Sequence, residues 1–89
     1  MRLTIIPSDK VIIKDGVAVN LSIDGATVFP TTDSNIHAIQ WYENKGSKQR
    51  VDNSELEWFE DESILNDYVT AHTTEITRLE NLVDNGGGE

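Results

Sequence analysis

Side chains that commonly carry out acid–base or metal chemistry are few and scattered in this chain. The two histidines, His37 and His72, lie far apart in the sequence, and no His-x-x-x-His or Glu-x-x-His pair accompanies them. Such spacings are what place two metal ligands on one face of a helix. The chain has no cysteine, which excludes disulfides and thiolate metal sites. We therefore predict no metal site.

Other kinds of catalytic site also lack a sequence signal. None of the serines has the flanking glycines of a nucleophile elbow, and no glycine-rich loop leads from a strand into a helix with a following lysine. Carboxylates are plentiful, but they form an acidic run and not a pocket that would separate their pKa values. We predict that the protein is not an enzyme and needs no cofactor.

Charge is distributed very unevenly along the chain, whose formal net charge is −9. Residues 1–50 contain six basic and five acidic side chains, whereas residues 51–89 contain Arg78 alone against eleven acids. An acidic half repels phosphate, so we expect no nucleic-acid ligand. It favours fast association with a basic protein surface, although a solvated helix face would show the same composition. No stretch is long and apolar enough for a signal peptide or a bilayer span, so no membrane partner is expected.

The elements that must position any site begin with a series of short strands. The 89 residues are sufficient for one domain. Apolar runs at 3–6, 11–14 and 17–21 are separated by turn residues, and Asp15-Gly16 predicts a type I′ hairpin. A short fourth strand at 27–29 is also predicted. These runs indicate an antiparallel meander.

Residues 36–43, Ile-His-Ala-Ile-Gln-Trp-Tyr-Glu, are predicted to be the central strand, because large apolar residues alternate onto both of its faces. We expect both faces to be covered. Gly46 is predicted to occupy a positive-φ turn position, after which 48–51 returns as a charged edge strand. Residues 55–60 form either a last short strand or the start of a helix, and we favour the strand.

From about residue 62 the apolar spacing becomes helical, with a heptad seam of Leu65, Val69, His72, Ile76, Leu79 and Val83. Asp61 or Ser63 is the predicted N-cap, and Asn85-Gly86 the predicted end. Several threonines weaken this helix, so burial of the seam has to stabilise it. It either folds back onto the domain's own sheet or packs on another chain, including a second copy.

The predicted fold class is therefore α+β: an antiparallel meander of five or six strands in residues 1–60, one amphipathic helix at 61–85 and a flexible glycine-rich tail at 86–89. Adjacent aromatic residues on a strand point to opposite faces, so one of each pair is expected at the surface, where aromatic residues make binding hot spots. Together with the seam, they give the predicted partner-binding residues: Trp41, Tyr42, Trp58, Phe59, Leu65, Tyr68, Val69, Ile76, Leu79 and Val83.

The order of these features resembles that of small proteins of tailed bacteriophages. The resemblance covers roughly residues 1–80, and its most specific part is Ile36-His37-Ala38-Ile39-Gln40-Trp41-Tyr42; residues 47–60 depart from the pattern. The group is similar to tail-fibre assembly chaperones and small accessory tail proteins. The resemblance implies a phage tail-fibre or baseplate protein as partner, and a location in the host cytoplasm during assembly or in the virion tail. An alternative hypothesis is an acidic phage inhibitor that mimics nucleic acid and blocks a host defence protein.

Overall fold

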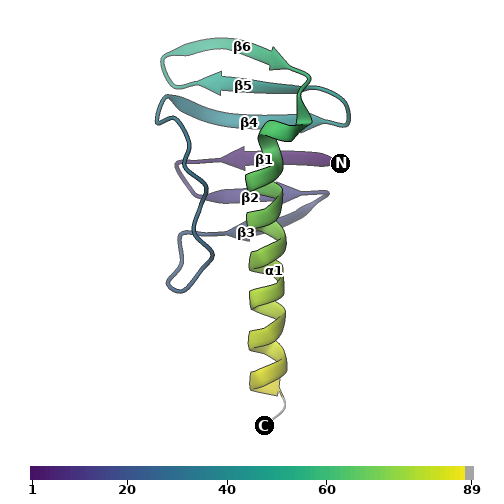
Figure 1. Cartoon of the computed structure of the whole chain (residues 1–89). Coiled ribbons are helices and arrows are strands. Elements are labelled where there is room, and N and C mark those ends of the chain that lie inside the picture. The colour runs from purple at the N-terminus through teal and green to yellow at the C-terminus, as the bar shows by residue number, and fades with distance from the viewer. Residues whose placement is uncertain (88–89) are drawn as a thin grey trace.

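A six-stranded antiparallel sheet followed by one C-terminal helix makes up the fold, which confirms the predicted α+β class (Figure 1). The computed structural model describes residues 1–87, and the side chains of all of these except 53–54 and 83–87. The elements are β1 (Arg2–Ile6), β2 (Val11–Lys14), β3 (Val17–Asn20), β4 (Ile36–Tyr42), β5 (Gly46–Arg50), β6 (Asn53–Phe59), the 3₁₀ turn η1 (Glu62–Leu65) and α1 (Asn66–Gly87). Their order in the sheet is β3-β2-β1-β4-β5-β6, so β1 and β4 are central.

Turn chemistry explains the first hairpins. Asp15 and Gly16 both have positive φ, 49° and 85°, as a type I′ turn between β2 and β3 requires. The prediction for Gly46 was wrong, because the positive-φ residue after β4 is Glu43, at 70°. Gly46 lies in β5, where a Cβ atom would come within 2.8 Å of the Gln40 carbonyl oxygen and would also collide with the Phe59 ring. Packing therefore requires glycine at this position.

Two strand predictions need correction. Residues 27–29 form no strand; they belong to an irregular connection, residues 21–35, that runs from β3 to β4. The segment expected as an edge strand is β5, which has β4 on one side and β6 on the other. The predicted strand at 55–60 does form, as part of β6 (Asn53–Phe59), and it takes the edge position.

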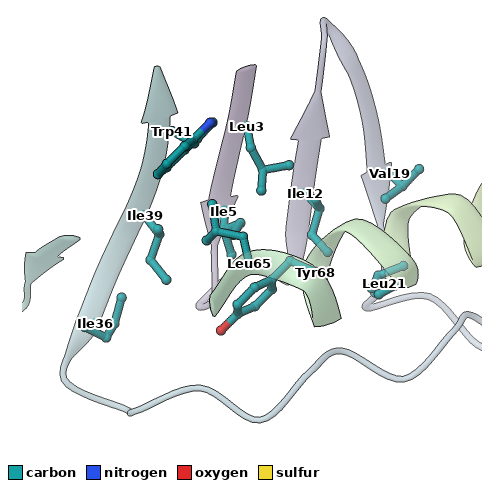
Figure 2. Close-up of a cluster of buried hydrophobic side chains, with 11 residues drawn as sticks. Leu3, Ile5, Ile12, Val19, Leu21, Ile36, Ile39, Trp41, Leu65 and Tyr68 are labelled. Atoms are coloured by element: carbon teal, nitrogen blue, oxygen red, sulfur yellow. The ribbon is translucent and has the colours of Figure 1, made fainter. Parts of the chain in front are cut away.

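Only one face of β4 is covered, which corrects the expectation that both faces are. Ile39 and Trp41 lie on the sheet face that α1 covers and are buried, and across the sheet they pair with Ile5 and Leu3 (Figure 2). An antiparallel sheet needs one covered face only, and this chain has a single helix to cover it. Ile36 is buried as well, because a register shift between Ile36 and Ala38 interrupts the alternation. The core is completed by Ile12, Val19, Leu21, Leu65, Tyr68 and Ala71.

The helical part of the chain begins at the predicted cap, but as a 3₁₀ turn, and the α-helix itself starts at Asn66, later than the predicted start at 61. Asp61 is the N-cap of η1, and its Oδ1 accepts a hydrogen bond from the Ser63 backbone N–H at 3.0 Å. From there α1 crosses the sheet over β1, β2 and β3 and continues past the β3 edge (Figure 1). It ends at Gly87, beyond the predicted end at Asn85-Gly86. The rest of the predicted tail, residues 88–89, lies outside the described residues.

Candidate protein-binding surface

The buried stripe of α1 differs from the predicted seam by a small rotation. Leu65 at the end of η1 and Tyr68, His72 and Glu75 of α1, at spacings of 3, 4 and 3, are all buried. Val69 and Ile76, which the predicted seam included, are only half-buried at the border of this stripe. The rotation arises because Tyr68 and Glu75 both contact the 21–35 connection, which wraps over this side of the helix.

Three contacts on α1 fix how far the domain covers it. His72 Nε2 donates to the Val17 carbonyl oxygen at 2.8 Å, on the β3 edge of the sheet. Tyr68 packs its ring against Phe29 with 5.8 Å between centroids. Glu75 binds Thr27 from the same connection. All three lie in the first half of α1, and the helix beyond them extends past the sheet (Figure 1).

The spacing of the buried stripe continues along α1 beyond the part of the helix that the sheet and the 21–35 connection cover. Continuing the alternation of 3 and 4 from Glu75 leads to Leu79 and then Leu82, which are 37% and 55% exposed. Ile76 is the last apolar side chain described on α1 that packs against the core. We call Leu79 and Leu82 the distal stripe. The two leucines form a small apolar patch in line with the buried stripe.

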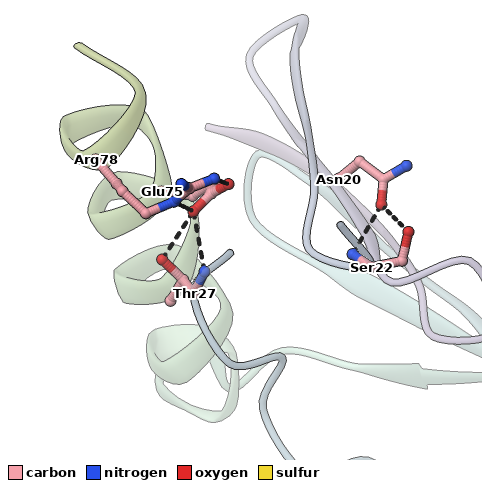
Figure 3. Close-up of polar contacts among 5 residues, drawn as sticks. All are labelled: Asn20, Ser22, Thr27, Glu75 and Arg78. Carbon is pink, nitrogen blue, oxygen red and sulfur yellow. Dashed lines mark hydrogen bonds and ion pairs between the residues drawn. The ribbon is translucent and has the colours of Figure 1, made fainter. Parts of the chain in front are cut away.

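A buried carboxylate ties the helix to the connection just before the distal stripe. Glu75 is fully buried, and its Oε1 accepts from both the backbone N–H and the hydroxyl of Thr27 at 3.0 Å (Figure 3). Arg78 binds both of its oxygens, from Nε at 2.8 Å and from Nη2 at 2.7 Å. These hydrogen bonds, that of Arg78 first, hold the pKa of the Glu75 carboxyl near 2, well below its usual 4.5, although burial acts in the opposite direction.

Replacing Glu75 by glutamine is therefore expected to destabilise the protein in a pH-dependent way. A carboxyl whose pKa falls on folding stabilises the native state fully above its unfolded pKa, about 4.5, and progressively less as the pH falls toward 2. The shift corresponds to roughly 3 kcal/mol at most. Urea unfolding of the wild type and Glu75→Gln should differ most above pH 5 and converge near pH 2. Glu80→Gln, an exposed change on the same helix, is the control, and a Glu75→Gln penalty that stays constant with pH would contradict this account.

The sheet face opposite α1 is a second uncovered surface. No helix or strand among residues 1–87 lies on it, and it carries Tyr42 and Trp58, whose rings are 6.2 Å apart. Trp58 is 54% exposed and lies beneath the Lys45 ammonium, which is 5.0 Å from its ring. Among the described strand side chains on this face there is no carboxylate, and Arg2 is the one charged residue. The other side chains are polar or apolar: Thr4, Ile6, Val11, Ile13, Ala18, Asn20, Ala38, Gln40, Tyr42, Ser47, Gln49, Leu56 and Trp58. Depletion of charge with exposed aromatics is characteristic of the centre of protein interfaces.

The structure divides the predicted partner-binding residues into three groups. Those buried in the protein's own core, and so unavailable at the surface, are Trp41, Leu65 and Tyr68. The half-buried ones are Tyr42, Phe59, Val69 and Ile76. The exposed ones are Trp58 and Leu79. The side chain of Val83 lies outside the described part of the chain.

Sequence reasoning missed several residues of these surfaces. Leu82, 55% exposed on α1, and Leu56, 45% exposed on β6, are not among the predicted partner-binding residues. Glu75 escaped notice although a signal existed, since Arg78, the single base of the acidic half, follows it at the helical spacing of three. The role of Thr27 had no local signal, because its contact with Glu75 spans 48 residues.

Within residues 1–87, no group of three or more histidine, aspartate or glutamate side chains is arranged to hold a metal ion, and no helix is long and apolar enough to cross a membrane. No protein-family model matches the sequence, and neither the curated proteins nor the solved structures include one that is significantly similar to it. The surfaces described above are thus the basis for any functional conclusion.

Proposed function

We propose that the protein is a non-enzymatic binding module whose distal stripe packs against a partner protein. The observation that carries this proposal is that the heptad spacing of α1 continues into Leu79 and Leu82 after the domain's own cover has ended. A leucine contributes about 1.5–3 kcal/mol when it passes from full exposure to full burial, and these two, 37% and 55% exposed, have about half of that still to gain. The helix end therefore gains stability by packing on a second protein.

The partner that we propose is a tail-fibre or baseplate protein of a tailed bacteriophage, with this chain acting as an assembly chaperone or as an adaptor in the virion. The resemblance of residues 36–42 to small tail accessory proteins supports this choice. The surface of such a partner is compatible with the distal stripe, because fibre subunits expose apolar edges and helices until they assemble. Such surfaces aggregate when they are left uncovered. An acidic module that covers them keeps the complex soluble.

Co-expression with the fibre and baseplate proteins encoded in the same genome tests this proposal. One of these proteins should co-purify with the chain and should be more soluble in its presence. The complex should survive 1 M salt, because apolar burial is not screened by ions. Separate purification with unchanged solubility would refute the proposal. A complex that dissociates steeply as salt rises would instead support the nucleic-acid-mimic alternative.

A further inference from the structure

The two edges of the sheet are protected to very different extents. β3, at one edge, has four residues, and α1 lies against it with His72 bound to the Val17 carbonyl oxygen. β6, at the other edge, has seven residues and pairs with β5 along one side, and nothing described lies along its other side (Figure 1). Proteins usually blunt such an edge with charged side chains, especially lysine, with proline, with a bulge or with a very short strand. β6 contains no lysine or proline, and its regularly paired part, residues 56–59, has one charged side chain, that of Glu57.

The two rows of side chains on β6 have opposite character. Leu56 and Trp58 point to the open sheet face and are 45% and 54% exposed. Glu57 stands between them, opposite Lys48 of β5, and points to the other face. Its side chain is 55% exposed while it pairs with Arg50 at 3.3 Å. A strand added at this edge would therefore meet an apolar row on one side and the Glu57 carboxylate on the other.

This pattern argues against a second copy of the chain as the added strand. If two β6 strands paired antiparallel about a two-fold axis perpendicular to the sheet, the Glu57 side chains of both copies would lie on the same face of neighbouring strands. Like charges directly opposite each other on neighbouring strands are destabilising. The exposed carboxylate of Glu57 is complementary to lysine or arginine instead.

We propose that β6 is a docking edge for an extended segment of a partner protein in which apolar side chains alternate with basic ones. The backbone of that segment pairs with the free edge of β6, its apolar side chains extend the row of Leu56 and Trp58, and its basic side chains lie beside Glu57. This inference deepens the proposed function and rests on it, since it gives the chemistry of a second contact made by the same partner.

A synthetic heptapeptide of alternating lysine and valine, acetylated and amidated, is the probe, and calorimetry with the full chain is the measurement. The alternating peptide should bind at least about tenfold more tightly than a peptide of identical composition with the lysines and valines in separate blocks. It should also bind more tightly than an alternating glutamate–valine peptide. No binding, or equal binding of the blocked and alternating lysine peptides, would overturn the proposal.

The variant Leu56→Asp separates strand docking from simple charge attraction. It adds a negative charge, so attraction alone would strengthen binding of the lysine peptide, whereas docking predicts about tenfold weaker binding because the apolar row is interrupted. Val51→Asp, in the exposed β5–β6 turn, adds the same charge off the edge and should show no weakening. If Leu56→Asp does not fold, Leu56→Thr takes its place as the test, because threonine keeps the strand propensity of this position. Leu56→Thr should also weaken binding of the lysine peptide. Leu79 and Leu82 are distant from this edge, so the two experiments test separate surfaces. If the peptide fails to bind while the partner still co-purifies with the chain, the docking edge is refuted and the proposed function is not.

Discussion

Replacing Leu79 and Leu82 together by glutamate is expected to abolish partner binding while leaving the protein folded. The two side chains, 37% and 55% exposed, together have about one leucine's area still to bury, which contributes on the order of 1.5–3 kcal/mol to the complex. Burying two carboxylates in their place adds a further penalty, so binding should weaken by more than roughly a hundredfold. Both side chains are exposed in the free protein, so the unfolding free energy should change by no more than about 0.5 kcal/mol. Co-purification and urea unfolding measure the two effects.

The matched control for this variant is Thr77→Glu together with Asn81→Glu. It adds the same two charges to the same stretch of α1, on the helix side opposite the distal stripe, where both residues are exposed. Co-purification should persist in the control. If both double variants lose the partner to the same extent, general charge repulsion is responsible and the distal stripe has no specific role.

Replacing Trp41 by alanine is expected to have the largest effect on stability. Trp41 is 2% exposed, packs on Phe59 at 5.7 Å between ring centroids, and donates from its indole N–H to the Glu43 carbonyl oxygen at 3.1 Å. Truncating a buried tryptophan costs about 3–5 kcal/mol, which is most of the stability of a domain of this size. Thermal unfolding followed by circular dichroism should show a protein that is largely unfolded at 37 °C.

The other tryptophan provides the comparison. Trp58 is 54% exposed, and its contacts are with Tyr42 and Lys45 at the surface. Trp58→Ala should cost no more than about 1 kcal/mol. If the two alanine variants were equally stable, the assignment of Trp41 to the core and of Trp58 to the open face would be wrong.

Local patterns were sufficient to predict much of this fold. The Asp15-Gly16 hairpin, the Asp61 cap, the strand around Ile39 and the helical spacing from Leu65 onward each depend on neighbouring residues alone, and the structure has all four. What could not be predicted depends on contacts between distant parts of the chain.

Glu75 is the best example of such a contact. A glutamate in the middle of a helix suggests solvent exposure, but the 21–35 connection passes over it and supplies Thr27. The same connection draws Tyr68 inward and so rotates the buried stripe away from Val69. Trp41 was assigned to the binding surface for a related reason, since alternation shows which residues share a face and not which face the helix covers.

We expect the end of α1 to be uncovered in the free protein and covered when the partner binds. Hydrogen–deuterium exchange of the backbone amides around Leu79 and Leu82, measured with and without the co-purified partner, distinguishes these two states. Exchange there should be fast in the free protein and strongly slowed in the complex, while exchange around Tyr68 and His72 should be slow in both. Equal exchange of the distal stripe in the free and bound protein would show that the partner does not cover it.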